Sequence, residues 1–178
     1  MIVWTLRHPP IDRSGRCVGQ TAVPLTMDLD EAVRSAVDTA PFVPLRVLSS
    51  DQPRCANLAH GIAGAWGVPV ALSPRLREMS FGEWEGMAYD DIDRLDGARW
   101  RAWCDDWKRA SPPSGESLPV FAARIRRWAL DEPPDERTVV VTHAGVIRAL
   151  RVMAGVSWDD AMAESHPYLG WMEHRLQP

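Results

Sequence analysis

The chain has 178 residues, of which 46% are apolar and 25% charged, so it is long enough for one domain with a substantial hydrophobic core. Its 20 basic and 24 acidic residues give a formal net charge of −4, which argues against bulk electrostatic binding to nucleic acid or an anionic membrane. The three cysteines form no CxxC pair, so we expect no disulfide framework. No leader pattern opens the chain, and no apolar run approaches the roughly 18 residues of a membrane span. We therefore expect a cytoplasmic protein.

Short runs of apolar and β-branched residues predict five strands, at residues 2–6, 45–49, 68–72, 138–142 and 168–172. The first and fourth runs are almost continuously apolar, which is typical of strands that are buried on both faces of a parallel sheet. A proline in the third run indicates an edge strand or a strand start.

Apolar residues at helical spacing fill the intervals between these strands. The second predicted helix follows Asp51, a candidate N-cap, and has Pro53 in its first turn. Alternating strands and helices predict an α/β fold, a three-layer α/β/α sandwich with a mostly parallel sheet. No loop is long enough to divide residues 1–178 into two domains. The helical stripes lie at residues 29–40, 55–66, 100–107, 118–128 and 146–154.

Polar side chains follow three of the predicted strands at the point where each strand ends. Arg7 and His8 follow the first strand, Arg54 comes soon after the second, and His143 follows the fourth. In an open parallel sheet the carboxyl ends of the strands share one rim, where ligands bind. Two histidines and two arginines at this rim, with helix N-termini beside them, favour a phosphate group as the ligand.

Such a cluster is suited to phosphoryl transfer. An imidazole can attack phosphorus and form a covalent intermediate, while guanidinium groups hold the phosphoryl oxygens. A carboxylic acid is then needed to protonate the leaving oxygen. This chemistry requires no metal ion and no cofactor, and the sequence has no metal-ligand spacing, so we expect neither.

Six sequence blocks resemble the signature blocks of the histidine phosphatase (phosphoglycerate mutase-like) superfamily, and they occur in the same order along the chain as in that family. Any one block is a weak signal, whereas six in the family's order are specific and span residues 2 to about 150. The resemblance implies a phosphoglycerate mutase-like fold. The blocks are Leu6-Arg7-His8-Pro9, Gly15 to Thr26, Ser49 to Ala56, Leu76 to Gly86, Gly115-Glu116-Ser117 and Val141-Thr142-His143-Ala144-Gly145.

The resemblance also implies a role for each matching residue. His8 would be the nucleophile, and Arg7, Arg54 and His143 would hold the phosphoryl oxygens. Glu78 would be the proton donor, with Glu83, Glu85 and Glu116 as rivals. At the substrate rim the resemblance places Gln20, Glu116 and Ser117, although the last two are also suited to capping the helix that begins near Leu118.

Within the superfamily, the proline after Arg-His and the Gly-x-Cys-x-Gly block most resemble α-ribazole phosphatases of cobalamin biosynthesis. The chain departs from the family pattern at Pro9, which replaces a glycine, and at Ala22, where an aspartate is common. These departures affect the choice of substrate more than the chemistry. Trp100, Trp103 and Trp107 share one predicted helical face, and we expect them to serve packing rather than a lid.

We therefore expect a metal-independent phosphomonoesterase that acts on a small phosphate ester, with α-ribazole 5′-phosphate the favoured substrate. Residues 76–117 would contribute a small cap over the site. The alternatives are phosphoglycerate mutase-type transfer and a catalytically silent phosphate-binding module. The sequence leaves the oligomeric state open.

Overall fold

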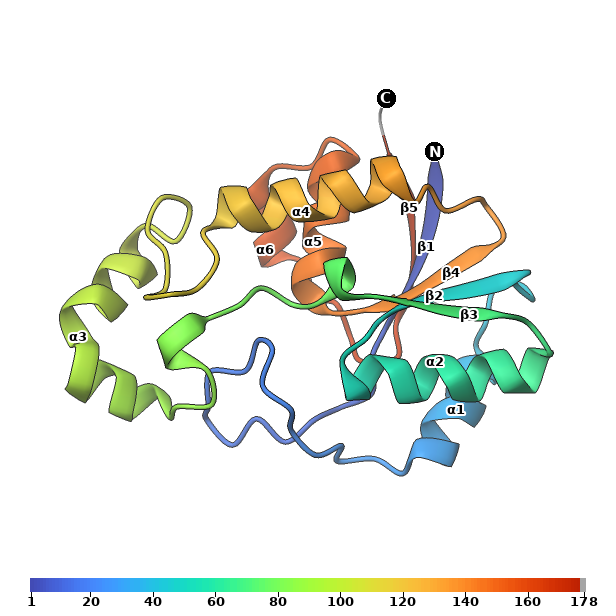
Figure 1. Ribbon diagram of the computed structural model, residues 1–178, viewed down its shortest axis with the longest axis horizontal. Helices are drawn as coiled ribbons and strands as arrows, with labels where there is room; N and C mark the ends of the chain where they lie inside the picture. The colour runs from blue at the N-terminus through green and yellow to red at the C-terminus, as the bar shows by residue number, and fades with distance from the viewer. Residues whose placement is uncertain (177–178) are drawn as a thin grey trace.

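Runs of valine and other apolar residues form the centre of a five-stranded sheet in the computed structural model, which describes residues 1–176 (Figure 1). The strand order is β3-β2-β4-β1-β5. Neighbouring strands from β3 to β1 are parallel, and β5 pairs with β1 in the antiparallel sense. The strands are β1 (Ile2–Arg7), β2 (Arg46–Ser50), β3 (Val70–Ser73), β4 (Thr138–Thr142) and β5 (Trp171–Arg175).

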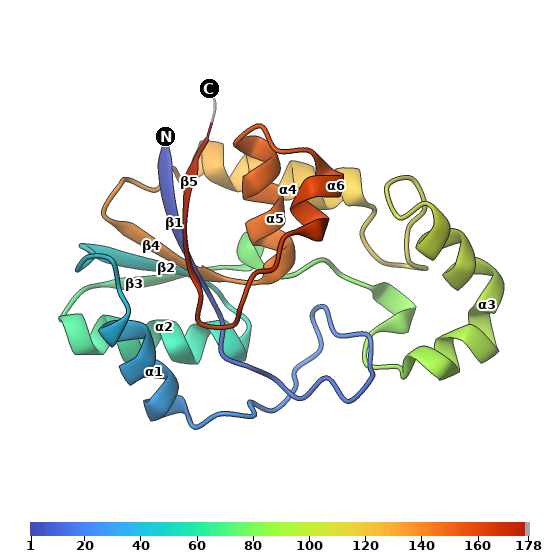
Figure 2. The same cartoon turned by 180° about the vertical axis from the view of Figure 1, so that it is seen from behind.

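Helices cover both faces of this sheet, as predicted, with α1 and α2 on one face and α4, α5 and α6 on the other (Figures 1 and 2). Longer α-helices alternate with the strands, and two short 3₁₀ helices, η1 and η2, follow β3. Among residues 1–176 no helix is long and apolar enough to cross a membrane. The helices are α1 (Leu29–Asp38), α2 (Pro53–Trp66), η1 (Pro74–Leu76), η2 (Gly82–Trp84), α3 (Tyr89–Asp105), α4 (Leu118–Asp131), α5 (Ala144–Met153) and α6 (Trp158–Ala163).

The hydrophobic core has a part on each side of the sheet because successive strand residues point to opposite faces. Val140 of β4 packs with the apolar faces of α4 and α5. Its neighbours Val139 and Val141 pack with α1 and α2 on the other side. Both faces of the central strands are therefore buried, as their continuous apolar composition predicts.

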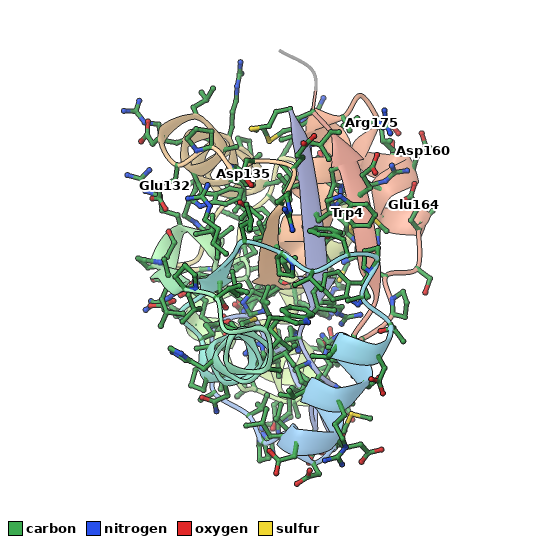
Figure 3. All side chains as sticks on the ribbon, turned by 90° about the vertical axis from the view of Figure 1, so that its right-hand side faces the viewer. Trp4, Glu132, Asp135, Asp160, Glu164 and Arg175 are labelled. Carbon is green, nitrogen blue, oxygen red and sulfur yellow. The ribbon has the colours of Figure 1, made fainter. Side chains whose placement is uncertain are left out.

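A third cluster lies away from the sheet, in a lobe built around α3 (Figure 1). Trp84 and Ile92 are fully buried there and pack with Cys17 from the segment after β1. Figure 3 views the opposite end of the molecule, where it labels Trp4 on β1 and charged side chains on the outer surface. The α3 lobe therefore lies beyond the carboxyl ends of the parallel strands, at the end of the molecule opposite to the surface in Figure 3.

Three local predictions differ from the structure. The last strand begins at Trp171, three residues later than predicted, and Trp107 lies beyond the end of α3. Asp51 does not cap α2; the N-cap is Gln52, because the Asp51 carboxylate instead accepts two hydrogen bonds from Arg77, at 2.7 and 2.5 Å. The Asp51–Arg77 pair ties the end of β2 to the segment that carries Glu78.

Candidate active site

The sheet brings the predicted residues together at the carboxyl ends of three neighbouring strands. Arg7 at the end of β1 pairs in register with Thr142 of β4, and Ser49 of β2 pairs with Val141. His8 and His143, one residue beyond β1 and β4, consequently lie with their ring centroids 5.2 Å apart. Residues that are 135 positions apart in the chain (143 − 8) thus share one site.

His8 is 3% exposed, and its ring is held in one tautomer. Its Nδ1 lies 2.7 Å from the carbonyl oxygen of Pro9. A carbonyl only accepts hydrogen bonds, so Nδ1 carries the proton and Nε2 keeps a free lone pair. Burial, with a smaller contribution from Arg54, lowers the pKa of His8 to about 3, so the ring is neutral at physiological pH. His8 therefore presents an unprotonated nitrogen.

His143 lies behind His8 and is fully buried. Arg54 Nε donates to its Nδ1 at 3.2 Å, so Nε2 carries the proton and donates to the Ser50 hydroxyl at 2.9 Å. Burial, together with the neighbouring His8 and Arg54, lowers the pKa of His143 far below the usual range. His143 is therefore not among the residues that line the cavity in front of His8, and its Nε2–H is engaged with Ser50.

Arg7 is positioned by the chain segment that leads into β5. Its guanidinium carbon lies 3.8 Å from the centre of the Tyr168 ring, and Nη1 donates to the carbonyl oxygen of His166. Burial lowers the pKa of Arg7, yet an arginine titrates so far above neutrality that it stays charged. The buried Nε of Arg7 has no hydrogen-bond partner among residues 1–176, which leaves a donor for a ligand.

Arg54, in the first turn of α2, connects His143 to the loop after β1. Besides Nε, its two terminal nitrogens donate to the carbonyl oxygens of Thr21 and Gly19, at 3.0 and 2.5 Å. This loop is fixed in turn by Glu85, whose carboxylate accepts backbone N–H bonds from Gly19 to Thr21 and from Phe81. Burial alone would raise the pKa of Glu85, but these hydrogen bonds outweigh it and lower the pKa.

Glu78 is the one carboxylate among the described residues that line the cavity in front of His8. Its Oε1 accepts from the backbone N–H of Met79 and its Oε2 from that of Gly145, both at 3.0 Å. Gly145 stands in the first turn of α5, and a Cβ there would overlap Glu78 Oε1. The close approach of carboxylate and helix thus requires glycine at this position.

The cavity itself has a volume of about 380 Å³ and holds most of the predicted site. His8, Arg7, Arg54 and Glu78 line it, together with two further arginines, Arg13 and Arg148. Its other lining residues are apolar or aromatic: Ile11, Val18, Met79, Phe81, Trp103, Cys104, Trp107, Leu118, Phe121, Ala144, Gly145, Trp158, Met162 and Tyr168. The cavity therefore combines positively charged guanidinium groups, the unprotonated Nε2 of His8 and the carboxyl group of Glu78.

Three residues predicted for the rim do not line this cavity. Gln20 donates through its side chain to the carbonyl oxygen of Glu78 at 3.0 Å. Glu116 accepts from Arg124 and from the backbone N–H of Ser80, and Ser117 is the N-cap of α4. Each of these side chains is hydrogen-bonded to another part of the protein and lies outside the cavity lining.

The sequence reasoning did not assign Tyr168, Arg13, Arg148 or Trp158, which also line the cavity. None belongs to a block that carried the resemblance, and Tyr168 and Trp158 lie in the part of the chain after those blocks. Arg148 lies one turn after Ala144, so helical spacing alone places it on the side of α5 that faces the site. Across residues 1–176 no group of three or more His, Cys, Asp or Glu side chains is placed to hold a metal ion.

Comparison with known proteins gives concordant matches. The chain matches the sequence model of the histidine phosphatase superfamily (branch 1) over residues 3–173. It is 32% identical over 158 residues to an adenosylcobalamin/alpha-ribazole phosphatase of Salmonella typhimurium, a match that covers 84% of this chain and 77% of that protein. It is 34% identical over 160 residues to a glucosyl-3-phosphoglycerate phosphatase of Mycobacterium tuberculosis, covering 82% of this chain and 71% of the relative.

The fold is also similar to solved structures. A crystal structure of a putative alpha-ribazole-5′-P phosphatase from Escherichia coli superposes with a TM-score of 0.86 and 26% sequence identity. That similarity covers 97% of this chain and 89% of the other. The family and structural matches therefore span nearly the whole chain, the sheet and the α3 lobe included.

Proposed function

This chain belongs to the histidine phosphatase superfamily and is a phosphomonoesterase, and we propose that it transfers the phosphoryl group first to His8 and then to water. The proposal assigns each step to the side chains that line the cavity. The observation that carries it is the unprotonated Nε2 of His8, in a residue that lines the same cavity as the guanidinium groups of Arg7 and Arg54 and the carboxyl group of Glu78.

In the first step, His8 Nε2 attacks phosphorus and the bond from phosphorus to the ester oxygen breaks. Arg7 and Arg54 hold the phosphoryl oxygens, and a proton from the Glu78 carboxyl group goes to the departing alkoxide. The hydrogen bond from Nδ1 to Pro9 remains and stabilises the positive charge that develops on the ring.

In the second step, the Glu78 carboxylate takes a proton from a water molecule, and the resulting hydroxide attacks the phosphorus of phosphohistidine. The bond from phosphorus to Nε2 breaks, inorganic phosphate leaves, and His8 and the protonated Glu78 are restored. His143 supports both steps by holding Arg54 through its Nδ1. Its Nε2–H donates to the Ser50 hydroxyl in this structure, and in this proposal it binds a phosphoryl oxygen only when that hydrogen bond is exchanged.

The proposed substrate is α-ribazole 5′-phosphate, supported by relatives whose names include alpha-ribazole phosphatase. Residues 76–117 serve as the cap in this proposal, because Phe81, Trp103 and Trp107 of that segment line the cavity. The proposed location is the cytoplasm, where the three free cysteines, Cys17, Cys55 and Cys104, would stay reduced.

The test is turnover of p-nitrophenyl phosphate in the presence of EDTA, by the wild type and by His8→Ala. We expect steady hydrolysis by the wild type and a loss of at least about a thousandfold in His8→Ala, roughly 4 kcal/mol of transition-state stabilisation. Vanadate should still bind the variant because Arg7 and Arg54 remain. Retention of more than about a tenth of the wild-type rate would contradict the role of His8, and a wild type without turnover would favour a phosphate-binding module.

The mutase alternative is tested with 3-phosphoglycerate, in the presence and absence of its 2,3-bisphosphate. Appearance of 2-phosphoglycerate and of inorganic phosphate is followed in the same samples. Under the proposal, phosphate release exceeds isomerisation because the phosphohistidine is open to water. Isomerisation that outran phosphate release would overturn the assignment as a phosphatase.

A further inference from the structure

Tyr168 contacts two groups of the proposed reaction at once. Its ring stacks on the Arg7 guanidinium, whose central carbon lies 3.8 Å from the ring centre. The same ring packs against the His8 imidazole, with ring centroids 5.5 Å apart and planes inclined at 54°. Tyr168 is half-buried and lines the cavity. One aromatic side chain therefore touches both the proposed nucleophile and a proposed phosphate-binding arginine.

Stacking on Tyr168 fixes the plane of the Arg7 guanidinium. All five N–H donors of a guanidinium lie in that plane, so a ring against its face leaves every donor available. One donor, on Nη1, goes to the carbonyl oxygen of His166. The Nε donor is buried and has no partner among the residues that the structure describes. Because a buried donor without a partner is unfavourable, the direction in which Nε points is suited to meeting a phosphoryl oxygen.

The backbone that carries Tyr168 is tied to Arg7 as well. Leu169 donates its backbone N–H to the Arg7 carbonyl oxygen at 3.1 Å, and the Arg7 N–H donates to the carbonyl oxygen of Gly170 at 3.2 Å. Figure 2 shows this segment, between α6 and β5, turning beside the carboxyl end of β1. Leu169 has a φ of +56°, a left-handed conformation that is unfavourable for residues other than glycine. The fold thus maintains a strained turn directly after the residue that stacks on Arg7.

We propose that Tyr168 is a positioning residue for phosphoryl transfer, whose ring holds the Arg7 guanidinium in the plane from which Nε donates to a phosphoryl oxygen. This inference rests on the proposed binding of phosphate by Arg7. The Tyr168 hydroxyl plays no part in it, because both contacts are made by the ring. Loss of the ring should therefore weaken anion binding through Arg7, and a phenylalanine should replace the tyrosine.

The test is a double-mutant cycle between Tyr168 and Arg7, in which the affinity for vanadate is measured. Tyr168→Leu should weaken vanadate binding about tenfold, the size of a partly desolvated cation–π contact, and kcat/KM for p-nitrophenyl phosphate should fall by at least as much. In the Arg7→Ala background the same substitution should change the vanadate affinity by less than about twofold, because the ring then has no guanidinium to hold.

Three further variants separate stacking from other effects. Tyr168→Phe keeps the ring and should restore the vanadate affinity to within about threefold of the wild type. Tyr168→Met removes the ring but keeps much of the side-chain volume, and should reproduce the result of Tyr168→Leu. Tyr89→Leu is the matched control, because Tyr89 is the only other tyrosine of the chain, packs on Trp100 and does not line the cavity. It should leave vanadate affinity unchanged in both Arg7 backgrounds.

Equal losses of vanadate affinity in the two backgrounds would show that Tyr168 supports the fold in general, and would overturn the inference. Unchanged affinity in Tyr168→Leu and Tyr168→Met, or a loss in Tyr168→Phe as large as in Tyr168→Leu, would overturn it too. Because vanadate binding requires no hydrolysis, failure of the proposed function is visible separately. A wild type that shows the expected cycle but does not hydrolyse p-nitrophenyl phosphate would remove the phosphatase reaction and leave the positioning of Arg7 intact.

Discussion

At the scale of single residues, the chemistry depends on which nitrogen of His8 carries the proton. The Pro9 carbonyl oxygen accepts a hydrogen bond from Nδ1–H, so Nε2 keeps the lone pair that attacks phosphorus in the proposed reaction. Any residue at position 9 has a carbonyl, so the replacement of the family's glycine by proline does not remove this contact. The sequence predicts His8 as the nucleophile, and that role stays a proposal. The tautomer of His8 could not be predicted, because it depends on the backbone direction after β1.

Glu78 is the residue whose role is most open to a direct kinetic test. Its rivals are engaged elsewhere, since Glu85 holds the loop at Gly19 to Thr21 and Glu116 binds Arg124. Glu83 is exposed and accepts from Ser114. The sequence distinguishes these glutamates only by their positions in a block, whereas in the structure they differ in which carboxylate faces the cavity.

We predict that Glu78→Gln lowers kcat/KM for an alkyl phosphate by about a hundredfold or more and for p-nitrophenyl phosphate by less than about tenfold. An alkoxide needs a proton when it departs, whereas p-nitrophenolate leaves without one. The comparison is made under conditions in which phosphoenzyme formation limits the rate. Equal losses for the two esters would reassign Glu78 to binding or folding.

At the scale of elements, the N-terminus of α5 and the side chain of Arg124 hold the Glu78 segment in place. Gly145 donates its backbone N–H to the carboxylate, and Arg124 of α4 donates to the carbonyl oxygens of Arg75, Arg77 and Glu78. The helices were predictable from apolar spacing. Their contacts with this loop were not, because Arg124 lies 46 residues from Glu78 in the chain.

Gly145→Ala should lower kcat for alkyl phosphates because the new Cβ overlaps Glu78 Oε1 and displaces the carboxylate. The expected loss is about tenfold or more, within the range that a positioned general acid contributes, with little change in the affinity for vanadate. The matched control is Gly64→Ala in α2, where an added Cβ meets nothing within 4 Å. Full activity in Gly145→Ala would show that the glycine does not position Glu78.

At the scale of the whole molecule, the sequence predicted the sheet, its edge strand and the helices on both faces, because these follow from local patterns. It did not predict α6 or the start of β5 at Trp171, since neither stands out in composition and both depend on packing against the rest of the fold. Trp103 and Trp107 do pack, as expected, but they also line the cavity. Periodicity alone could not separate these two roles.

The fold also keeps several histidines neutral, which couples its stability to pH. Burial lowers the pKa of His174 to about 4, whereas an unfolded histidine titrates near 6.5. The unfolded chain therefore binds more protons between these values, so the free energy of unfolding decreases as the pH falls from about 6.5 toward 4. Each such histidine contributes a slope of at most about 1.4 kcal/mol per pH unit.

His174→Gln should lose less stability on acidification than the wild type over this range, by up to about 1.4 kcal/mol per pH unit, and should keep wild-type activity. Its side chain contacts Thr5 in β1, outside the cavity residues, and glutamine can retain that hydrogen bond. Denaturant unfolding at pH 6.5 and 4.5 measures the difference, with exposed His60→Asn as the control. Equal pH slopes for His174→Gln and the wild type would contradict the assignment.

The most direct test of the central claim is to trap the phosphoenzyme and locate its phosphoryl group. The enzyme is mixed with excess phosphate ester, stopped in alkaline detergent so that phosphohistidine survives, and digested for mass spectrometry. We predict that one phosphoryl group is found on His8, that none is found on His143, and that none is found in His8→Ala. A phosphoryl group on another residue, or turnover without any phosphoenzyme under conditions in which its hydrolysis limits the rate, would contradict transfer through His8.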